Sequence, residues 1–386
     1  MRIVGLLIFE LDIPFVDDFA HSAKTRAFSD SIVVKVTAND GSIGYGEGVA
    51  RPYVTGESVD ACVEHIKAWL WPAIANRDFE DIRPGPDPLA VLAPISNRLP
   101  DIESPPVIAW HAARTALELA LIDCALRRQK LSLGAVLPPK RPTVTYSGVI
   151  TASTPEKAAQ HAKHFKLFGI QQIKIKIGDS ADRARIAAVR EVLGPDTSLR
   201  VDANGAYGPE EARDTLNSLA EFNIACVEQP LPRGNPADLH EVRKAILIPV
   251  MADESLVTLP DARTLIAYQA CDYFNLRLSK CGGLYRTLQL AQLARQAGIR
   301  LQLGCQVGET AVLSAVGRHV AAYLDEVDFV EGSYGNLLLK EDIARDNIRF
   351  GHGGRASVLR GAGLGIQVRD DLLEKFARRI TRLGCA

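Results

Sequence analysis

Residues 173–177 read Ile-Lys-Ile-Lys-Ile and are followed by Gly178, a pattern that indicates the fold class of the whole chain. Because successive side chains of a strand point to opposite faces, Lys174 and Lys176 share one face and the isoleucines share the other. A buried lysine is costly unless it is paired or functional. The pattern therefore predicts a strand whose apolar face packs under helices and whose lysines point into the interior of a barrel.

The same unit, a short apolar strand followed by a helix, recurs along the chain. Segments with helical apolar spacing separate the predicted strands. The strands are expected at 144–146, 173–177, 199–202, 224–228, 248–253, 273–280, 300–303 and 327–331. Eight such units over roughly 200 residues fit a parallel (β/α)8 barrel. An open doubly wound sheet is the alternative, but it normally needs a glycine-rich phosphate turn after its first strand, and none is present there.

Four charged residues, Asp202, Glu228, Asp253 and Lys280, close consecutive predicted strands. Counted from Lys174, the successive separations are 28, 26, 25 and 27 residues, about one βα unit each. The residues are therefore expected at one height, at the C-terminal strand ends where such barrels carry active sites. Three converging carboxylates favour a hard cation, Mg²⁺, with Mn²⁺ as an alternative ion. A single acid there is usually a turn former or helix cap, but chance rarely produces this register over five strands.

A metal site flanked by lysines indicates proton transfer beside a carboxylate. The metal would neutralise the substrate carboxylate and stabilise the enediolate that forms when the α-proton leaves. The base must be a neutral amine, and nearby cations together with partial burial lower the pKa of a lysine. Lys174 and the metal are the cations expected near Lys176, and Lys280 would act on the other face of the same carbon.

The chain before the barrel predicts a small α+β domain. Residues 1 to about 50 alternate as strands with a turn at 39–41, and helical spacing follows at 58–70 and 108–127. The tail contains a glycine-rich stretch and a final amphipathic helix, and it is expected to return to this domain. The expected division is a capping domain over 1–135, a barrel over 136–354 and a C-terminal return over 355–386.

Composition excludes several classes of protein. Lys+Arg is 45 and Asp+Glu is 46, without a basic stripe, so a nucleic-acid partner is not expected. No apolar run reaches the roughly 18 residues of a membrane span, and the N-terminus reads as a strand rather than a signal peptide. Seven dispersed cysteines argue against a disulfide framework and a structural zinc site. A soluble, cytoplasmic protein with no membrane partner is expected.

The motifs closely resemble the enolase superfamily, and within it the muconate-lactonizing-enzyme (muconate cycloisomerase) subgroup, over essentially the whole chain. They are Lys174-Ile-Lys176, Asp202-Ala-Asn204, Glu228-Gln-Pro230, Asp253-Glu-Ser255 and Lys280-Cys-Gly-Gly283. The resemblance implies a modified TIM barrel, (β/α)7β, with an N-terminal α+β cap, and it implies a homo-oligomer.

The resemblance also assigns roles to the residues of these motifs. Mg²⁺ would be held by Asp202, Glu228 and Asp253, and Lys176 and Lys280 would form the acid/base pair on opposite faces of the substrate. Lys174 would hold the substrate carboxylate and help to keep the neighbouring lysine neutral. The groups expected to support the metal ligands from outside are Asn204 and Glu254.

The substrate-binding residues implied by the resemblance lie in loops. The family uses two cap loops, here about 15–24 with His21 and 49–56 with Tyr53, although each could be an ordinary loop position. Glu309, after the seventh strand, is expected near the substrate carboxylate or Lys280. At the eighth strand, dipeptide epimerases carry Asp-x-Asp, and this chain has Glu331 instead, which argues against ordinary dipeptide epimerisation. Glu331 could hold a cationic nitrogen or be a solvated acid at a strand end.

The predicted function is Mg-dependent removal of the α-proton of a small-molecule carboxylate. Two lysines that reach both faces favour an isomerase: a cycloisomerase of the muconate-lactonizing type, or a racemase or epimerase of an amino-acid derivative or dipeptide. A syn-dehydratase resembling o-succinylbenzoate synthase is the alternative enzyme. A non-catalytic barrel that serves as a binding module is the alternative of another class, and the presence of all six site residues disfavours it.

Overall fold

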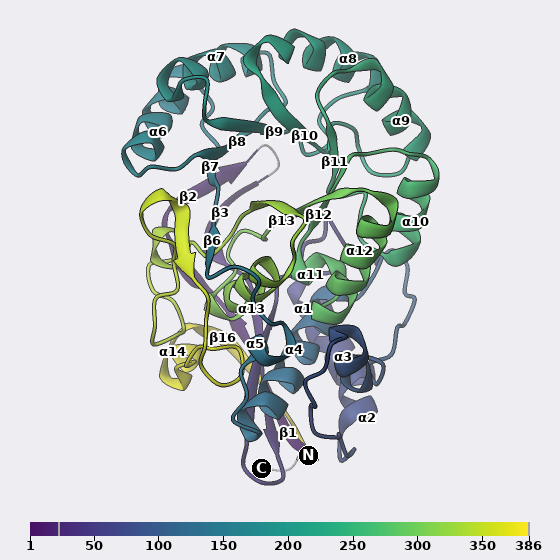
Figure 1. Ribbon diagram of the computed structural model, residues 1–386. Helices are drawn as coiled ribbons and strands as arrows, with labels where there is room; N and C mark the ends of the chain where they lie inside the picture. The colour runs from purple at the N-terminus through teal and green to yellow at the C-terminus, as the bar shows by residue number, and fades with distance from the viewer. Residues whose placement is uncertain (22–23, 385–386) are drawn as a thin grey trace.

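The computed structural model describes residues 1–21 and 24–384, with side chains described outside 17–26. A parallel sheet of eight strands, in the order β14-β13-β12-β11-β10-β9-β8-β7, curls inside a layer of helices (Figure 1). Its strands are β7 (Gly148–Ile150), β8 (Gln172–Lys176), β9 (Ser198–Asp202), β10 (Ile224–Glu228), β11 (Val250–Ala252), β12 (Tyr273–Leu276), β13 (Arg300–Leu303) and β14 (Val327–Val330). Neighbouring strands in this sheet are also neighbours in the chain, as the repeated βα unit predicts.

Helices connect these strands. They are α6 (Pro155–Leu167), α7 (Asp182–Leu193), α8 (Pro209–Ser218), α9 (Pro236–Ala245), α10 (Leu259–Ala267), α11 (Leu278–Cys281), α12 (Leu284–Ala297) and α13 (Ala311–Tyr323), with the 3-10 turn η2 (Ala220–Phe222). Several begin with a side-chain cap and an early proline. At α10, for example, Thr258 accepts from the Asp261 backbone in a capping box. No barrel helix follows β14 in the described chain, so the architecture is (β/α)7β, as the resemblance implied, rather than (β/α)8.

Two predicted strand boundaries are wrong. The first barrel strand is β7, because β6 (Thr143–Thr145) pairs antiparallel with β15 (Arg355–Ser357) outside the barrel sheet. Gly148 obscures β7 in the sequence, and a Cβ at this position would lie 2.7 Å from the Phe165 ring, so a larger residue would require that ring to shift. The strand predicted over 273–280 ends at Leu276, and Lys280 therefore lies in the short helix α11 instead of closing a strand.

A second, antiparallel sheet forms the cap, in the order β16-β1-β4-β5. Its strands are β1 (Ile3–Leu11), β4 (Ile32–Ala38), β5 (Ile43–Gly48) and β16 (Ala377–Gly384), and a separate hairpin joins β2 (Ile13–His21) to β3 (Lys24–Ser29). Gly41 makes the predicted turn between β4 and β5 with a φ of 83°. The last described element is a strand and not the predicted helix: α14 (Asp370–Phe376) is short, and β16 pairs along β1, so the first and last described strands lie side by side (Figure 1).

The remaining elements complete the cap and the segment after the barrel. The cap helices are α1 (Val59–His65), the π-helical turn η1 (Ile66–Leu70), α2 (Trp71–Ile74), α3 (Pro88–Ser96), α4 (His111–Arg128) and α5 (Leu133–Val136), and the 3-10 turns η3 (Gly335–Leu337) and η4 (His352–Gly354) follow β14. The base of the β2–β3 hairpin reaches this last segment, because the Val16 amide donates to the Leu338 carbonyl at 2.8 Å. Across the described residues, no helix has the length and apolar character needed to cross a bilayer.

Candidate active site

The curled sheet brings the predicted site residues to one end of the barrel. Asp202 and Glu228 are the last residues of β9 and β10 and lie opposite each other in the ladder. Asp253 follows β11 directly, and Lys280 comes from α11. Together with Lys174 on β8, all of these side chains are buried. The convergence expected from the spacing is therefore present in the structure.

Positive and negative side chains alternate through this site. Lys176 Nζ lies 2.5 Å from Asp202 Oδ2, and Lys174 Nζ lies 3.3 Å from both Asp202 Oδ2 and Glu228 Oε2. At the other end, Lys280 Nζ donates to Asp253 Oδ1 at 2.9 Å and to the Asp253 carbonyl at 2.7 Å. The carboxylates are thus separated from one another by cationic groups, which offsets their mutual repulsion.

Arg277 fills the position between the second and third carboxylates, and the sequence reasoning did not assign it a role. Its Nη2 donates to Glu228 Oε1 at 3.2 Å and to Asp253 Oδ2. The alternation that placed Lys174 could have found it, because Asn275 and Arg277 are two residues apart and both bond Glu228. Burial alone would raise the pKa of Glu228, but Lys174 and Arg277 outweigh it and hold that pKa well below its usual value.

The carboxylate oxygens of the site are the kind of ligand that a hard divalent cation prefers. Three buried carboxylates at adjacent strand ends supply oxygen ligands without any soft donor, as Mg²⁺ prefers. Glu228 and Asp253 face a common point, since one guanidinium group bonds both. Within residues 1–21 and 24–384, however, no three His, Cys, Asp or Glu side chains enclose a metal position by themselves, because Lys174 and Arg277 lie between them.

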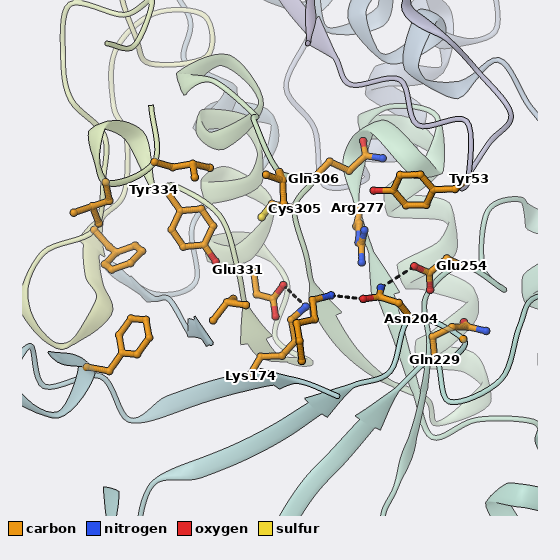
Figure 2. Close-up of a pocket in the computed structure, with 18 of the residues that line it drawn as sticks. Tyr53, Lys174, Asn204, Gln229, Glu254, Arg277, Cys305, Gln306, Glu331 and Tyr334 are labelled. Atoms are coloured by element: carbon orange, nitrogen blue, oxygen red, sulfur yellow. Dashed lines mark hydrogen bonds and ion pairs between the residues drawn. The ribbon is translucent and has the colours of Figure 1, made fainter. Parts of the chain in front are cut away.

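Asn204 and Glu254 connect the lysine on β8 to the far side of the site. The Asn204 amide oxygen accepts from Lys176 Nζ at 2.6 Å, and its nitrogen donates to Glu254 Oε1 at 3.1 Å (Figure 2). Burial, followed by the neighbouring Asp253 carboxylate, raises the pKa of Glu254 to about 7. Asn204 has a φ of 46°, a left-handed conformation that asparagine tolerates better than most residues. This geometry holds the Lys176 amine in one direction.

A cavity of about 690 Å³ opens onto these residues. Among the predicted residues, its wall includes Tyr53, Lys174, Lys176, Asn204, Glu254 and Glu331 (Figure 2). Lys280 is fully buried and does not line the wall, because it is turned toward Asp253 and the Asn275 carbonyl. The side chain of His21 lies outside the described residues, so its predicted role stays a prediction.

The structure places the two remaining predicted acids differently. Glu331 is buried and not solvated: its Oε2 lies 2.8 Å from Lys174 Nζ and its Oε1 lies 2.7 Å from Arg200 Nη2. The alternative of a solvated strand-end acid is therefore wrong. Glu309 is absent from the cavity wall, and its Oε1 accepts from the Gln306 backbone at 2.6 Å. Burial raises the pKa of Glu309 to about 8.

Comparison with known proteins assigns this architecture to a family. Residues 157–372 match the family model described as Enolase C-terminal domain-like. The chain is 30% identical to the N-succinyl-L-Arg/Lys racemase of Bacillus cereus, over 97% of this chain and 98% of that protein. It is 27% identical to muconate cycloisomerase 1 of Rhodococcus opacus, over 98% of this chain and 99% of that one.

Solved structures agree with this assignment. The crystal structure of a dipeptide epimerase from Cytophaga hutchinsonii, complexed with Mg and the dipeptide D-Ala-L-Val, superposes with a TM-score of 0.87. The two sequences are 28% identical, and the match covers the whole of both chains. With a family match over more than half of its length and a relative at 30% identity along nearly all of it, the chain belongs to the enolase superfamily, as its motifs predicted.

Proposed function

We propose that this protein is an isomerase that removes the α-proton of a small-molecule carboxylate and returns it to either face, as a racemase or epimerase. The observation that carries the proposal is the position of two amines at opposite ends of one row of carboxylates. Lys176 comes from β8 and contacts Asp202, while Lys280 comes from α11 and contacts Asp253. A planar enediolate held along that row can exchange a proton with Lys176, which lines the cavity, and on its other side with Lys280, once the Lys280 amine leaves Asp253 and the Asn275 carbonyl.

Mg²⁺ is the cofactor that fits the proposal, with Asp202, Glu228 and Asp253 as its ligands. When bound, the ion supplies positive charge to the substrate carboxylate and to the charge that develops on its oxygens. Relatives support this choice, since the Cytophaga hutchinsonii epimerase is described as complexed with Mg. Mn²⁺, which shares the oxygen-ligand preference, is proposed as an alternative ion.

Lys174 and Lys176 have different roles in this proposal. Burial lowers the pKa of Lys174, but Glu228, Glu331 and Asp202 outweigh that effect and hold it well above its usual value. Lys174 is therefore a permanent cation suited to binding the substrate carboxylate, and it does not serve as the base. Lys176 is the amine that moves the proton, and its bond to the Asn204 amide oxygen aims it at the α-carbon.

Hydrogen–deuterium exchange tests the proposal directly. N-acylamino acids of each configuration are incubated with enzyme and Mg²⁺ in D₂O, and NMR follows loss of the α-hydrogen while chiral chromatography follows inversion. Wild type is expected to exchange and invert both enantiomers. Lys176→Ala and Lys280→Ala should each reduce inversion by roughly 10²–10⁴-fold, as expected for loss of an acid/base group. Lys67→Ala, at an exposed residue that pairs with Glu64 in the cap, is the matched control and should leave the rate unchanged.

Other outcomes separate the alternatives. A product with a new double bond, without exchange in recovered substrate, would indicate a syn-dehydratase. A ring-closed product from a muconate would indicate a cycloisomerase, which the relative in Rhodococcus opacus keeps as the second candidate. Absence of exchange with every substrate, together with absence of Mg²⁺ binding by calorimetry, would indicate a binding module.

A further inference from the structure

The cavity that contains Lys174 and Lys176 extends beyond the charged residues to a second, apolar part. The residues that line this part are Phe165, Phe168, Tyr334, Leu337, Leu338 and Phe350, and we refer to them as the apolar end. Phe350 joins them into one surface, because its ring packs edge-on against Phe168 at 6.3 Å and against Tyr334 at 5.9 Å. In Figure 2, Tyr334 lies on the opposite side of Lys174 and Glu331 from Tyr53. The cavity therefore has room for a large group beside the reacting carbon.

One polar group at the apolar end lacks a partner. The Tyr334 hydroxyl is buried and donates no hydrogen bond to any described residue, although its ring lines the cavity. Burial and the nearby Cys305 and Glu331 raise the pKa of Tyr334, so the hydroxyl remains a donor. Buried polar groups are nearly always satisfied, and an unsatisfied donor on a cavity wall indicates a ligand with an acceptor oxygen.

The charges around the apolar end exclude a cationic ligand group. Glu254 and Glu331 are the carboxylates among the described residues that line the cavity. Both oxygens of Glu331 are occupied, one by Lys174 at 2.8 Å and the other by Arg200 at 2.7 Å. Glu254 has one unpaired oxygen, but it lies beside Asn204, across Lys174 from Tyr334 (Figure 2). An ammonium or guanidinium group at the apolar end would therefore meet no unpaired carboxylate, and its desolvation would not be compensated.

We propose that the substrate is an N-acylamino acid whose acyl chain ends in a bulky, neutral, apolar group that occupies the apolar end. The Tyr334 hydroxyl donates to the acyl carbonyl, and Lys174 faces the carboxylate. This inference rests on the proposed function, because it places the α-carbon beside Lys176. It assigns Tyr334 as a substrate-binding residue and the aromatic wall as the determinant of acyl preference.

A matched substrate panel tests the preference. The probes are N-acetylalanine, N-(4-phenylbutanoyl)alanine, N-succinylalanine and N-(5-aminopentanoyl)alanine, which vary only the acyl end. The ratio kcat/KM for α-hydrogen exchange in D₂O should be at least tenfold higher for the phenylbutanoyl compound than for the other three. Equal rates across the panel, or a preference for the cationic or anionic compound, would overturn the inference while leaving the proposed function intact.

Tyr334→Phe tests the hydrogen bond without changing the shape of the side chain. We expect KM for the phenylbutanoyl compound to rise about tenfold with little change in kcat, because the bond is made in the ground state and the transition state alike. Tyr268→Phe, at an exposed tyrosine beyond the end of α10, is the control and should not change KM. An unchanged KM in Tyr334→Phe would show that the hydroxyl does not bind substrate.

Leu337→Glu provides a gain-of-function test. This leucine is 45% exposed, so the variant should fold, and the new carboxylate would stand at the apolar end without a partner. We expect the aminopentanoyl compound to become a better substrate than the phenylbutanoyl compound for this variant. An unchanged ratio of kcat/KM between the two compounds would contradict the proposed location.

If none of the compounds exchanges its α-hydrogen, the proposed function fails, and calorimetry then tests whether the apolar end binds the acyl group. Tighter binding of phenylbutanoylalanine to wild type than to Tyr334→Phe would support it, and equal binding would overturn it.

Discussion

At the level of single residues, the charged side chains in the barrel interior are buried in contact with partners of opposite charge. Glu228 is the centre of this arrangement, because Lys174, Arg277, Asn275 and Gln302 all donate to its two oxygens. Removing one partner of a buried pair leaves an uncompensated charge, which costs more than the pair itself contributes. Substitutions in this row should therefore be charge-neutral and isosteric wherever activity is to be separated from folding.

The neutral state of His319 gives a prediction at the same scale. Burial lowers the pKa of His319 to about 4, from an ordinary value of 6.5. Between those values the unfolded chain binds more protons than the folded one, so stability is lost as pH falls from about 6.5 towards 4. Relative to His319→Gln, which can still donate to the Leu364 carbonyl, wild type should lose on the order of 2 kcal/mol between pH 7.5 and pH 5.

Urea unfolding of both proteins at the two pH values measures this loss. Using the difference between wild type and His319→Gln removes the contribution of other titrating groups, such as Glu309, which the two proteins share. An equal difference in unfolding free energy at pH 7.5 and pH 5 would contradict the assignment of His319 as a buried neutral imidazole.

At the level of elements, the contact between β5 and α4 depends on glycine and small side chains. The strand contributes Gly44, Gly46 and Gly48, and the helix contributes Ala112, Ala116, Ala120 and Cys124. The glycines are two residues apart, so they lie on one face of the strand. The helix residues are four apart, so they lie on one face of the helix. A Cβ built on any of the three glycines would overlap the helix backbone, which means that the cap requires glycine there.

Gly46→Ala should therefore destabilise the protein strongly. The added methyl would meet the Ala116 carbonyl and the Ala120 amide, which are rigid backbone groups that cannot rotate away. We expect a loss of about 3 kcal/mol in unfolding free energy, at the upper end of overpacking effects. Gly85→Ala is the control, because a Cβ at Gly85 comes no closer than 3.6 Å to another residue. Similar melting temperatures for the two variants would argue against the close approach.

At the scale of the whole molecule, buried polar contacts hold the cap against the barrel loop that forms part of the cavity wall. The contacts to this loop and to the start of α13 are Glu47 with Thr310 and Leu313, Ser29 with Gly308, and Arg51 with Val307. The loop between them supplies Cys305, Gln306 and Val307 to the cavity. The position of that wall is thus set by residues more than two hundred positions away in the chain.

Glu47→Ala should loosen that wall. Glu47 accepts from the Thr310 amide at 2.8 Å, the Thr310 hydroxyl at 2.7 Å and the Leu313 amide at 3.0 Å, so its loss leaves the start of α13 without these acceptors. A cost of about 3 kcal/mol is expected, with Glu47→Gln intermediate because it keeps one acceptor oxygen. Hydrogen exchange should accelerate at 304–313, whereas Glu64→Ala, at an exposed pair, should not change it. Unaltered exchange in Glu47→Ala would disprove this coupling.

The amino-acid sequence alone predicted the barrel and most of its strand ends. Periodicity is local, so it correctly predicted the inward face of Lys174 and the spacing of the three carboxylates. It failed at β7, which contains Gly148, at the end of β12, where α11 begins, and at the last element, where β16 forms in place of the predicted helix. The ion pairs of the site depend on the tertiary structure and cannot be predicted from local periodicity. Arg200 and Lys174 reach Glu331 across 131 and 157 residues, and Tyr334 joins the cavity wall, because the curling of the sheet brings these distant side chains together.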